Sequence, residues 1–118
     1  MSILVLGGAG FIGGHIAARH LARGERVVVL DSFCRRGTRE NVAWLKAHFP
    51  AVECVEADIA RDRDALHRAV AGASTVFHMA GQVAVTTSVK DPRADFEANA
   101  LGTFNVLEAI RLENPAVP

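Results

Sequence analysis

Apolar residues in this chain fall into short runs separated by amphipathic stretches. Unbroken runs at 3–6 and 27–30, and mixed runs at 52–56 and 74–78, have the length of strands. The unbroken ones are typical of strands buried on both faces of a parallel sheet. The stretches 10–23, 38–49, 62–71 and 92–113 carry apolar residues at helical spacing. Four strands that each precede a helix predict a doubly wound parallel α/β sheet.

Local signals predict three details of these elements. Thr38 is placed to cap the amino end of the second helix, and Asp91 followed by Pro92 is placed to begin the last one. The polar stretch 86–88 is expected to be a loop. The last helix is expected to align one stripe of side chains, namely Phe96, Ala100, Thr103, Leu107 and Ile110.

A cluster of glycines follows the first predicted strand directly. Gly8, Gly10 and Gly13 match G-x-G-x-x-G, and Gly7 with the last two matches G-x-x-G-x-x-G. Glycine permits a sharp turn, and a residue without Cβ lets a pyrophosphate approach the backbone at the amino end of the next helix. A tight turn in a domain that binds no nucleotide is the alternative. The strand before and the helix after favour a Rossmann-like, dinucleotide-binding domain.

An acidic residue ends the second predicted strand, 18 residues after Gly13. The Asp31 carboxylate can accept both hydroxyl protons of an adenosine ribose and would repel a 2′-phosphate, which favours NAD over NADP. The alternative is that Asp31 is a turn residue. Arg35 and Arg36 favour NADP, because a guanidinium can bind a 2′-phosphate, unless they simply lie in a solvated loop. The strand-end position ranks Asp31 above the two arginines.

Residues after the third and fourth predicted strands are further candidates. The Asp58 carboxylate can accept the exocyclic amine of an adenine while Ile59 packs near the ring. Asp58 is equally well placed to cap the following helix. The small residues after His78 leave room for a ligand at the carboxyl end of the sheet. His78 itself is interpreted as a packed core residue.

Composition excludes several classes of function. Lys plus Arg and Asp plus Glu both number 13 in 118 residues, so a zero net charge argues against nucleic acid as the main partner. No apolar run approaches the roughly 18 residues that span a bilayer, and the amino end lacks a basic leader. Cys34 and Cys54 form no Cys-x-x-Cys and are expected to be free thiols in a reducing compartment. We therefore expect one cytoplasmic domain, residues 1–118, that needs no membrane.

Several motifs occur together along the chain: GGAGFIG at 7–13, Asp31, DI at 58–59, HMAG at 78–81, NALGT at 99–103 and NVLEA at 105–109. In combination they resemble the N-terminal part of the extended short-chain dehydrogenase/reductase superfamily, the NAD-dependent epimerase/dehydratases of nucleotide sugars. The resemblance covers the whole chain. The stretches 31–45 and 78–96 are similar to one branch, the CDP-paratose 2-epimerases, also called CDP-tyvelose epimerases.

The resemblance implies a role for each matching position. The NAD pyrophosphate would be held by Gly7, Gly10, Phe11, Ile12 and Gly13. The adenosine moiety would be held by Asp31, with Ser32 and Arg35 nearby, and by Asp58 and Ile59 beside adenine. The nicotinamide side would be lined by Ala80, Gly81 and Gln82, with Asn99 below the cofactor and residues 86–88 facing the sugar. Bound NAD would take a hydride from the sugar, and the keto intermediate would be re-reduced or dehydrated.

One departure from the family pattern is decisive for catalysis. The family uses a Tyr-x-x-x-Lys pair, in which the tyrosine is the general base and the lysine lowers its pKa. This chain contains no tyrosine. The later strands and the C-terminal sugar-binding domain are also missing. We therefore assign no catalytic residue and expect an inactive cofactor-binding portion, either a fragment of a longer enzyme, which we favour, or a truncated product.

Other functions remain open at this point. A non-catalytic Rossmann module that senses NAD(H) is compatible with the missing tyrosine, and an atypical NADP-dependent reductase is compatible with the two arginines. The resemblance also implies a homodimer formed through the helix at 92–113, because family members commonly dimerise there. With the neighbouring helix missing, apolar surface on this helix is expected to be exposed.

Overall fold

The computed structural model describes residues 1–82 and 84–118. Its strands are β1 (Ser2–Leu6), β2 (Val27–Asp31), β3 (Glu53–Glu56) and β4 (Ala73–His78). Its helices are α1 (Phe11–Ala22), α2 (Thr38–His48), α3 (Arg63–Ala71), α4 (Val85–Lys90), α5 (Pro92–Phe96), the π-helical turn η1 (Glu97–Leu101) and α6 (Gly102–Glu113). The predicted alternation of strands and helices is confirmed.

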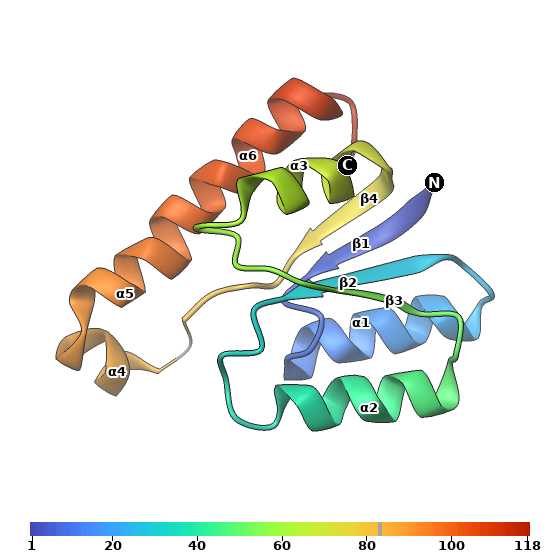
Figure 1. Ribbon diagram of the computed structural model, residues 1–118, viewed down its shortest axis with the longest axis horizontal. Coiled ribbons are helices and arrows are strands. Elements are labelled where there is room, and N and C mark those ends of the chain that lie inside the picture. The colour runs from blue at the N-terminus through green and yellow to red at the C-terminus, as the bar shows by residue number, and fades with distance from the viewer. Residues whose placement is uncertain (83) are drawn as a thin grey trace.

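The four strands form one parallel sheet in the order β3-β2-β1-β4 (Figure 1). β1 is central, and its last residue, Leu6, pairs with Leu30 of β2 on one side and with His78 of β4 on the other. All five residues of β1 are buried, as expected of a strand covered on both faces. The chain crosses from β3 at one edge to β4 at the other, so the strand order reverses at β1. Doubly wound sheets bind ligands at such a reversal, outside the carboxyl ends of the strands.

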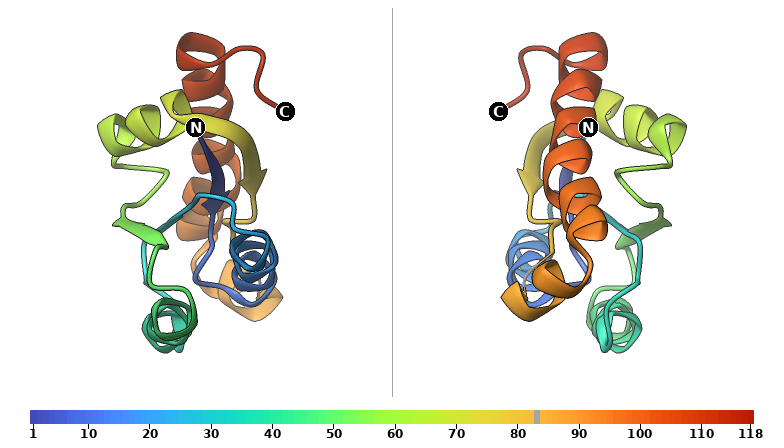
Figure 2. Two further views of the ribbon diagram at one scale, coloured as in Figure 1. Left: turned by 90° about the vertical axis from the view of Figure 1, so that its right-hand side faces the viewer. Right: turned by 90° about the vertical axis from the view of Figure 1, so that its left-hand side faces the viewer.

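Helices cover both faces of this sheet, which Figure 2 shows edge-on. α1 and α2 lie on one face, while α3 and α6 lie on the other (Figure 1). Successive side chains of β1 enter opposite cores, because strand side chains alternate between faces. Val5 packs in a cluster with Leu21 of α1, whereas Leu4 packs in a second cluster with Leu66 of α3 and Val106 of α6.

The predicted start of the last helix is confirmed, but two other local predictions are wrong. Asp91 accepts the N–H of Ala94 at 3.1 Å as the N-cap of α5. Gly37, not Thr38, is the N-cap of α2, and its φ of 86° suits a residue without Cβ. Thr38 is the first helical residue, and its hydroxyl donates to the Arg35 carbonyl oxygen at 2.7 Å. Residues 86–88 belong to α4 and are not a loop.

The stripe predicted on the last helix differs from the buried face of that helix. Phe96 and Leu107 of that stripe are 62% and 61% exposed, which confirms the apolar surface expected to be exposed on this helix. The buried face of α6 consists instead of Gly102, Asn105, Val106 and Ala109. The π-helical turn η1 precedes this face, and its wider turn changes the register, so positions counted at α-helical spacing across it do not select a single face.

Asn105 joins α6 to the loop that follows β3, and its removal gives the first prediction. The side chain is buried, and its Nδ2 donates to the carbonyl oxygens of Ile59 at 2.9 Å and Ala60 at 3.3 Å. Asn105→Ala leaves both oxygens without this donor, so we expect the free energy of unfolding to fall by about 1–3 kcal/mol. Urea unfolding followed by circular dichroism measures this, with the exposed Arg111→Ala as the control that keeps the wild-type midpoint. An unchanged midpoint in Asn105→Ala would contradict the assigned bonds.

Candidate functional site

A cleft opens at the carboxyl ends of the strands, where the strand order reverses. It is lined by residues from the β1–α1 turn, the end of β2 and its loop, the first residue of α2, the β3–α3 loop, the β4 loop and η1. These are Gly7, Gly10, Leu30, Asp31, Ser32, Cys34, Arg35, Thr38, Ala57, Asp58, Ile59, Met79, Ala80, Gly81 and Ala98. Nine of the fourteen residues predicted from the sequence therefore line one cleft. The other five, Phe11, Ile12, Gly13, Gln82 and Asn99, lie outside this lining set.

The glycines of the β1–α1 turn serve different physical purposes. A Cβ on Gly13 would lie 2.3 Å from the Gly7 carbonyl oxygen, and a Cβ on Gly7 would lie 2.6 Å from the Ala80 nitrogen. Both positions must be glycine for the strand, the helix and the β4 loop to approach one another. Gly10 differs, because its Cβ would meet only the Gly7 oxygen at an ordinary 3.4 Å. Within the chain no close contact requires glycine at Gly10, which fits a position that a ligand approaches.

The amino end of α1 is open to an anion. Gly10 is the N-cap, makes no side-chain cap bond, and is followed by a first turn without an acidic residue. The first N–H groups of any helix lack intrahelical partners, and the helix dipole adds partial positive charge there. Phe11 and Ile12 begin this helix and are 77% and 63% exposed, so their N–H groups belong to the first turn that lacks intrahelical partners. This arrangement suits a phosphate group.

Asp31 lies at the end of β2 and joins two loops. Its Oδ2 accepts the Ala9 N–H of the glycine turn at 3.0 Å, and its Oδ1 accepts the Phe33 N–H at 2.9 Å. Phe33 has a positive φ of 57°, which this bond helps to hold. Each carboxylate oxygen accepts more than one hydrogen bond, so capacity remains for two hydroxyl groups. Of the two arginines, Arg35 lines the cleft beside Asp31.

Asp58 and Ile59 line the same cleft from the end of the neighbouring strand, β3. The Asp58 Oδ1 accepts the Ala60 N–H at 2.8 Å, and the Asp58 N–H donates to Asp62 Oδ2 at 2.7 Å. Asp62 is the N-cap residue of α3, so Asp58 is not the capping acid that the alternative interpretation required. Ile59 is buried because Gly102 of α6 leaves room for it, and a Cβ there would lie 2.7 Å from Ile59 Cδ1.

Asn99 ties the β4 loop to the π-helical turn. Its Oδ1 accepts the Gln82 N–H at 2.7 Å and would meet a Cβ on Gly81 at 3.0 Å. Its Nδ2 donates to Asp95 Oδ1 at 3.0 Å, which also accepts the Ser88 hydroxyl at 2.6 Å. The sequence interpretation missed Asp95, and it placed Ser88 only in a stretch that would face the sugar, not in contact with Asp95. The i,i+4 spacing of Asp95 and Asn99 was the available signal, but the spacing alone does not show that Asn99 bonds the β4 loop while Asp95 bonds Ser88 of α4.

His78 ends β4 and is a structural residue, as interpreted. Its Nε2 shares a hydrogen bond with the Thr103 hydroxyl at 2.9 Å, which links the sheet to α6. Burial lowers the pKa of His78 below its ordinary value, which favours the neutral imidazole. Its Nδ1 is buried and has no partner among the residues that the structure describes.

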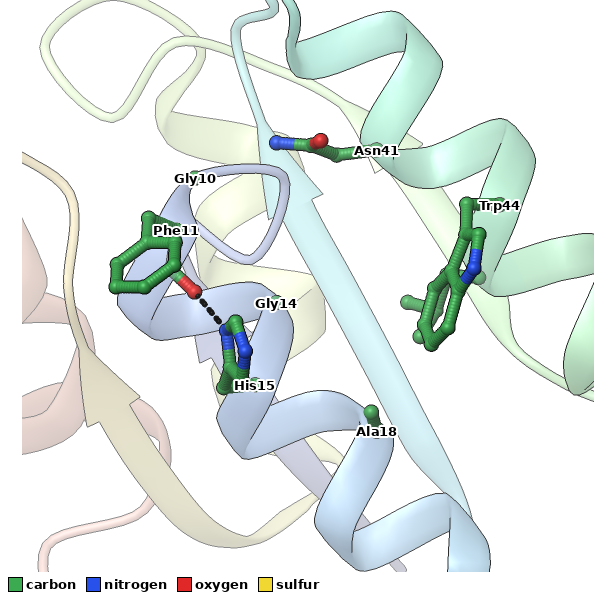
Figure 3. Close-up of a pocket in the computed structure, with 8 residues that line it drawn as sticks. Gly10, Phe11, Gly14, His15, Ala18, Asn41 and Trp44 are labelled. Atoms are coloured by element: carbon green, nitrogen blue, oxygen red, sulfur yellow. Dashed lines mark hydrogen bonds between the residues drawn. The ribbon is translucent and has the colours of Figure 1, made fainter.

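A second groove lies between α1 and α2, beside the glycine turn (Figure 3). It is mainly apolar and is bordered by Phe11 and His15 of α1 and by Asn41 and Trp44 of α2. The Phe11 and His15 rings meet edge to face at 4.7 Å. In contrast with the cleft, this groove has no carboxylate or guanidinium among its lining residues.

Residues 1–82 and 84–118 lack two other kinds of feature. No group of three or more His, Cys, Asp or Glu side chains there is placed to hold a metal ion. No helix in the same ranges is long and apolar enough to cross a membrane. Cys34 and Cys54 are both free thiols, as expected, and burial raises the pKa of Cys54.

Comparison with known sequences agrees with this geometry. The model of a family described as the NAD dependent epimerase/dehydratase family matches residues 3–117. The chain is 40% identical over 116 residues to CDP-paratose 2-epimerase of Salmonella typhi, an alignment that covers 97% of this chain and 34% of that protein.

Solved structures give the same result. UDP-glucose 4-epimerase of Thermus thermophilus, in complex with NAD, has a TM-score of 0.79 and 44% identity over 94% of this chain and 34% of its own. A dTDP-glucose 4,6-dehydratase of Streptomyces venezuelae with NAD bound has a TM-score of 0.80 and 35% identity over 93% of this chain and 35% of its own. The chain spans about a third of the length of these relatives. By sequence and by fold, it belongs to the NAD dependent epimerase/dehydratase family.

Proposed function

We propose that these 118 residues are the NAD-binding portion of a nucleotide-sugar epimerase/dehydratase. The observation that carries this proposal is the cleft in which the open amino end of α1 and the Asp31 carboxylate meet. A helix amino end attracts a pyrophosphate, and a strand-end carboxylate binds ribose hydroxyls. When bound, NAD would supply a hydride acceptor and donor for a sugar carbon.

Different residues of the cleft would bind different parts of an extended dinucleotide. The N–H groups of 11–13 would bind the pyrophosphate, and Asp31, with Ser32 beside it, would bind the adenosine ribose. Asp58 and Ile59, at the end of the neighbouring strand β3, would flank adenine. At the other end Ala80 and Gly81 leave space for the nicotinamide ribose, while Asn99 orients the Gln82 backbone from below. The small residues Ala80 and Gly81 at one end of the cleft, and the carboxylates of Asp31 and Asp58 at the other, support placing nicotinamide at the first end and adenosine at the second.

Catalysis is not assigned to any residue of this chain. The sequence contains no tyrosine, so the Tyr-x-x-x-Lys pair expected for the family is absent from these 118 residues. We therefore propose that the hydride-transfer step depends on residues of a longer enzyme, of which this chain is a fragment rather than a truncated product. The nucleotide sugar would be that enzyme's substrate.

Arg35 supports a second candidate, an NADP-dependent reductase, because it lines the cleft close to the Asp31 end. A guanidinium there could pair with a 2′-phosphate. The Asp31 carboxylate would repel the same phosphate, and its two backbone bonds hold it at the strand end. NAD is therefore the proposed cofactor. A non-catalytic module that senses NAD(H) would use the same cleft and differs only in what the longer protein does.

Binding of NAD through Asp31 is the second prediction. Calorimetric titration of the 118-residue chain is expected to show binding of NAD and weaker binding of NADP. Asp31→Asn keeps the shape and an acceptor oxygen but loses the charge, so we expect NAD affinity to fall about 10- to 100-fold, the range for a hydrogen bond to a charged group. The exposed acid Asp64 of α3 provides the control, Asp64→Asn. A folded chain that binds neither nucleotide would contradict the proposal, and tighter binding of NADP would favour the reductase.

Self-association through α6 is the third prediction, and it concerns the proposed homodimer. Phe96, Leu101, Phe104 and Leu107 are exposed along η1 and the two helices that flank it. Exposed apolar side chains in a row mark association surfaces. We expect sedimentation to give twice the 12.6 kDa mass of one chain. Phe104→Asp is expected to restore that single mass, whereas Trp44→Asp, on α2 and also exposed, is expected to leave the dimer intact. A wild-type monomer at high concentration would contradict the proposal.

A further inference from the structure

The residue at the centre of the glycine turn is held from two sides. Ala9 is fully buried, and its N–H donates to Asp31 Oδ2 at 3.0 Å. Its carbonyl oxygen accepts a hydrogen bond from Asn41 Nδ2 at 2.8 Å. Asn41 belongs to α2, and Figure 3 shows its side chain reaching toward the turn beside Gly10. Two separate elements therefore bind the two polar backbone groups of one turn residue.

These two bonds fix two successive peptide planes. The Ala9 N–H belongs to the peptide that joins Gly8 to Ala9, and the Ala9 carbonyl belongs to the peptide that joins Ala9 to Gly10. Within the turn, the Gly10 N–H donates to the Gly7 oxygen at 3.1 Å. A turn with so many glycines has wide conformational freedom when it is not restrained, and ordering it costs free energy. The side-chain bonds remove this freedom in advance.

The direction of the carbonyl group also matters for an anion. Asn41 lines the groove between α1 and α2 and is not among the residues that line the cleft. The Ala9 oxygen is therefore held by a side chain of the groove between α1 and α2, and not by a residue that lines the cleft. A carbonyl turned into the cleft would repel a phosphate oxygen there.

The position of Asn41 is itself well fixed. Its backbone N–H donates to the Gly37 oxygen at 3.0 Å in the first turn of α2, which follows the left-handed Gly37. The Thr38 hydroxyl anchors the same turn to the Arg35 oxygen. The distance from α2 to the glycine turn is thus set by backbone geometry, and the short Asn41 side chain spans it.

We propose that Asn41 is a positioning residue, which together with Asp31 holds the glycine turn in its anion-binding shape before a dinucleotide arrives. This inference rests on the proposed function of the cleft and adds Asn41, which does not line the cleft, to the residues that set NAD affinity. Asp31 then has two roles. It binds the ribose, and together with Asn41 it forms the two hydrogen bonds to the Ala9 backbone, called the Ala9 clamp below.

The test compares Asn41→Asp, Asn41→Ala and the control Ala43→Asp, which adds the same charge on an exposed residue of α2. Asn41→Asp keeps the shape but presents a carboxylate to the Ala9 oxygen, so NAD affinity at pH 7 is expected to fall about tenfold or more. Asn41→Ala is expected to lose about threefold to tenfold. Ala43→Asp is expected to bind NAD as the wild type does.

Measuring NAD affinity at several pH values shows whether residue 41 acts as a hydrogen-bond donor or only fills space. A protonated carboxyl can donate, and the ordinary pKa of Asp is about 3.9. Lowering the pH from about 7 to about 4 is expected to bring the affinity of Asn41→Asp back toward that of the wild type at the same pH. The deficit of Asn41→Ala is expected to remain. A purely structural role gives no such recovery, and its absence would overturn the proposal.

Amide hydrogen exchange measured by NMR tests, in the absence of any ligand, whether the Ala9 clamp orders the glycine turn. The Ala9 and Gly10 amides are expected to exchange faster in Asn41→Asp, while the β1 and β2 amides keep their wild-type protection and show that the fold is intact. Wild-type NAD affinity in both Asn41 variants would overturn the proposal. If the wild type binds no NAD, the proposed function fails, and unchanged exchange at Ala9 and Gly10 would separately overturn the clamp.

Discussion

The close approach of Gly13 to the Gly7 carbonyl oxygen is the contact on which the rest of this structure depends. A Cβ on Gly13 would come within 2.3 Å of that oxygen, so any side chain there would push α1 away from β1. With hydrogen in its place, the helix begins directly above the end of the central strand. The open N–H groups of α1 then lie where the strand order reverses. Packing of the fold and placement of the anion site therefore have one cause.

Three polar side chains connect the loops around this point. Asp31 joins the glycine turn to the loop after β2, Asn41 joins the same turn to α2, and Asn99 joins the β4 loop to η1. Each bonds the backbone of a segment far away in the sequence. Loops with few apolar contacts depend on such bonds for a defined shape. The cleft is therefore an ordered surface formed by loops rather than a gap between helices.

The sequence predicted the sheet, the alternation and most residues of the cleft, because strand runs and glycine spacing are local signals. It failed where the outcome depends on backbone geometry. Thr38 has a good capping side chain, yet the left-handed turn at Gly37 moves the cap back by one residue. Nor did helical spacing show the π-helical turn at 97–101, which precedes the buried face of the last helix. The role of Asn41 was not foreseen, since an asparagine on an exposed helix face has no distinctive local pattern. Only the tertiary fold brings it to Ala9.

The central claim is that a dinucleotide binds across the carboxyl edge of the sheet. An amide NMR spectrum of the chain titrated with NAD tests it residue by residue. The account predicts shifts at 10–13, at Asp31, at Asp58 and at Gly81. It predicts none at Arg26, which lies with Met1 and Gly72 around the opposite, amino edge. Shifts confined to that opposite edge, or to the groove beside Trp44, would contradict the account.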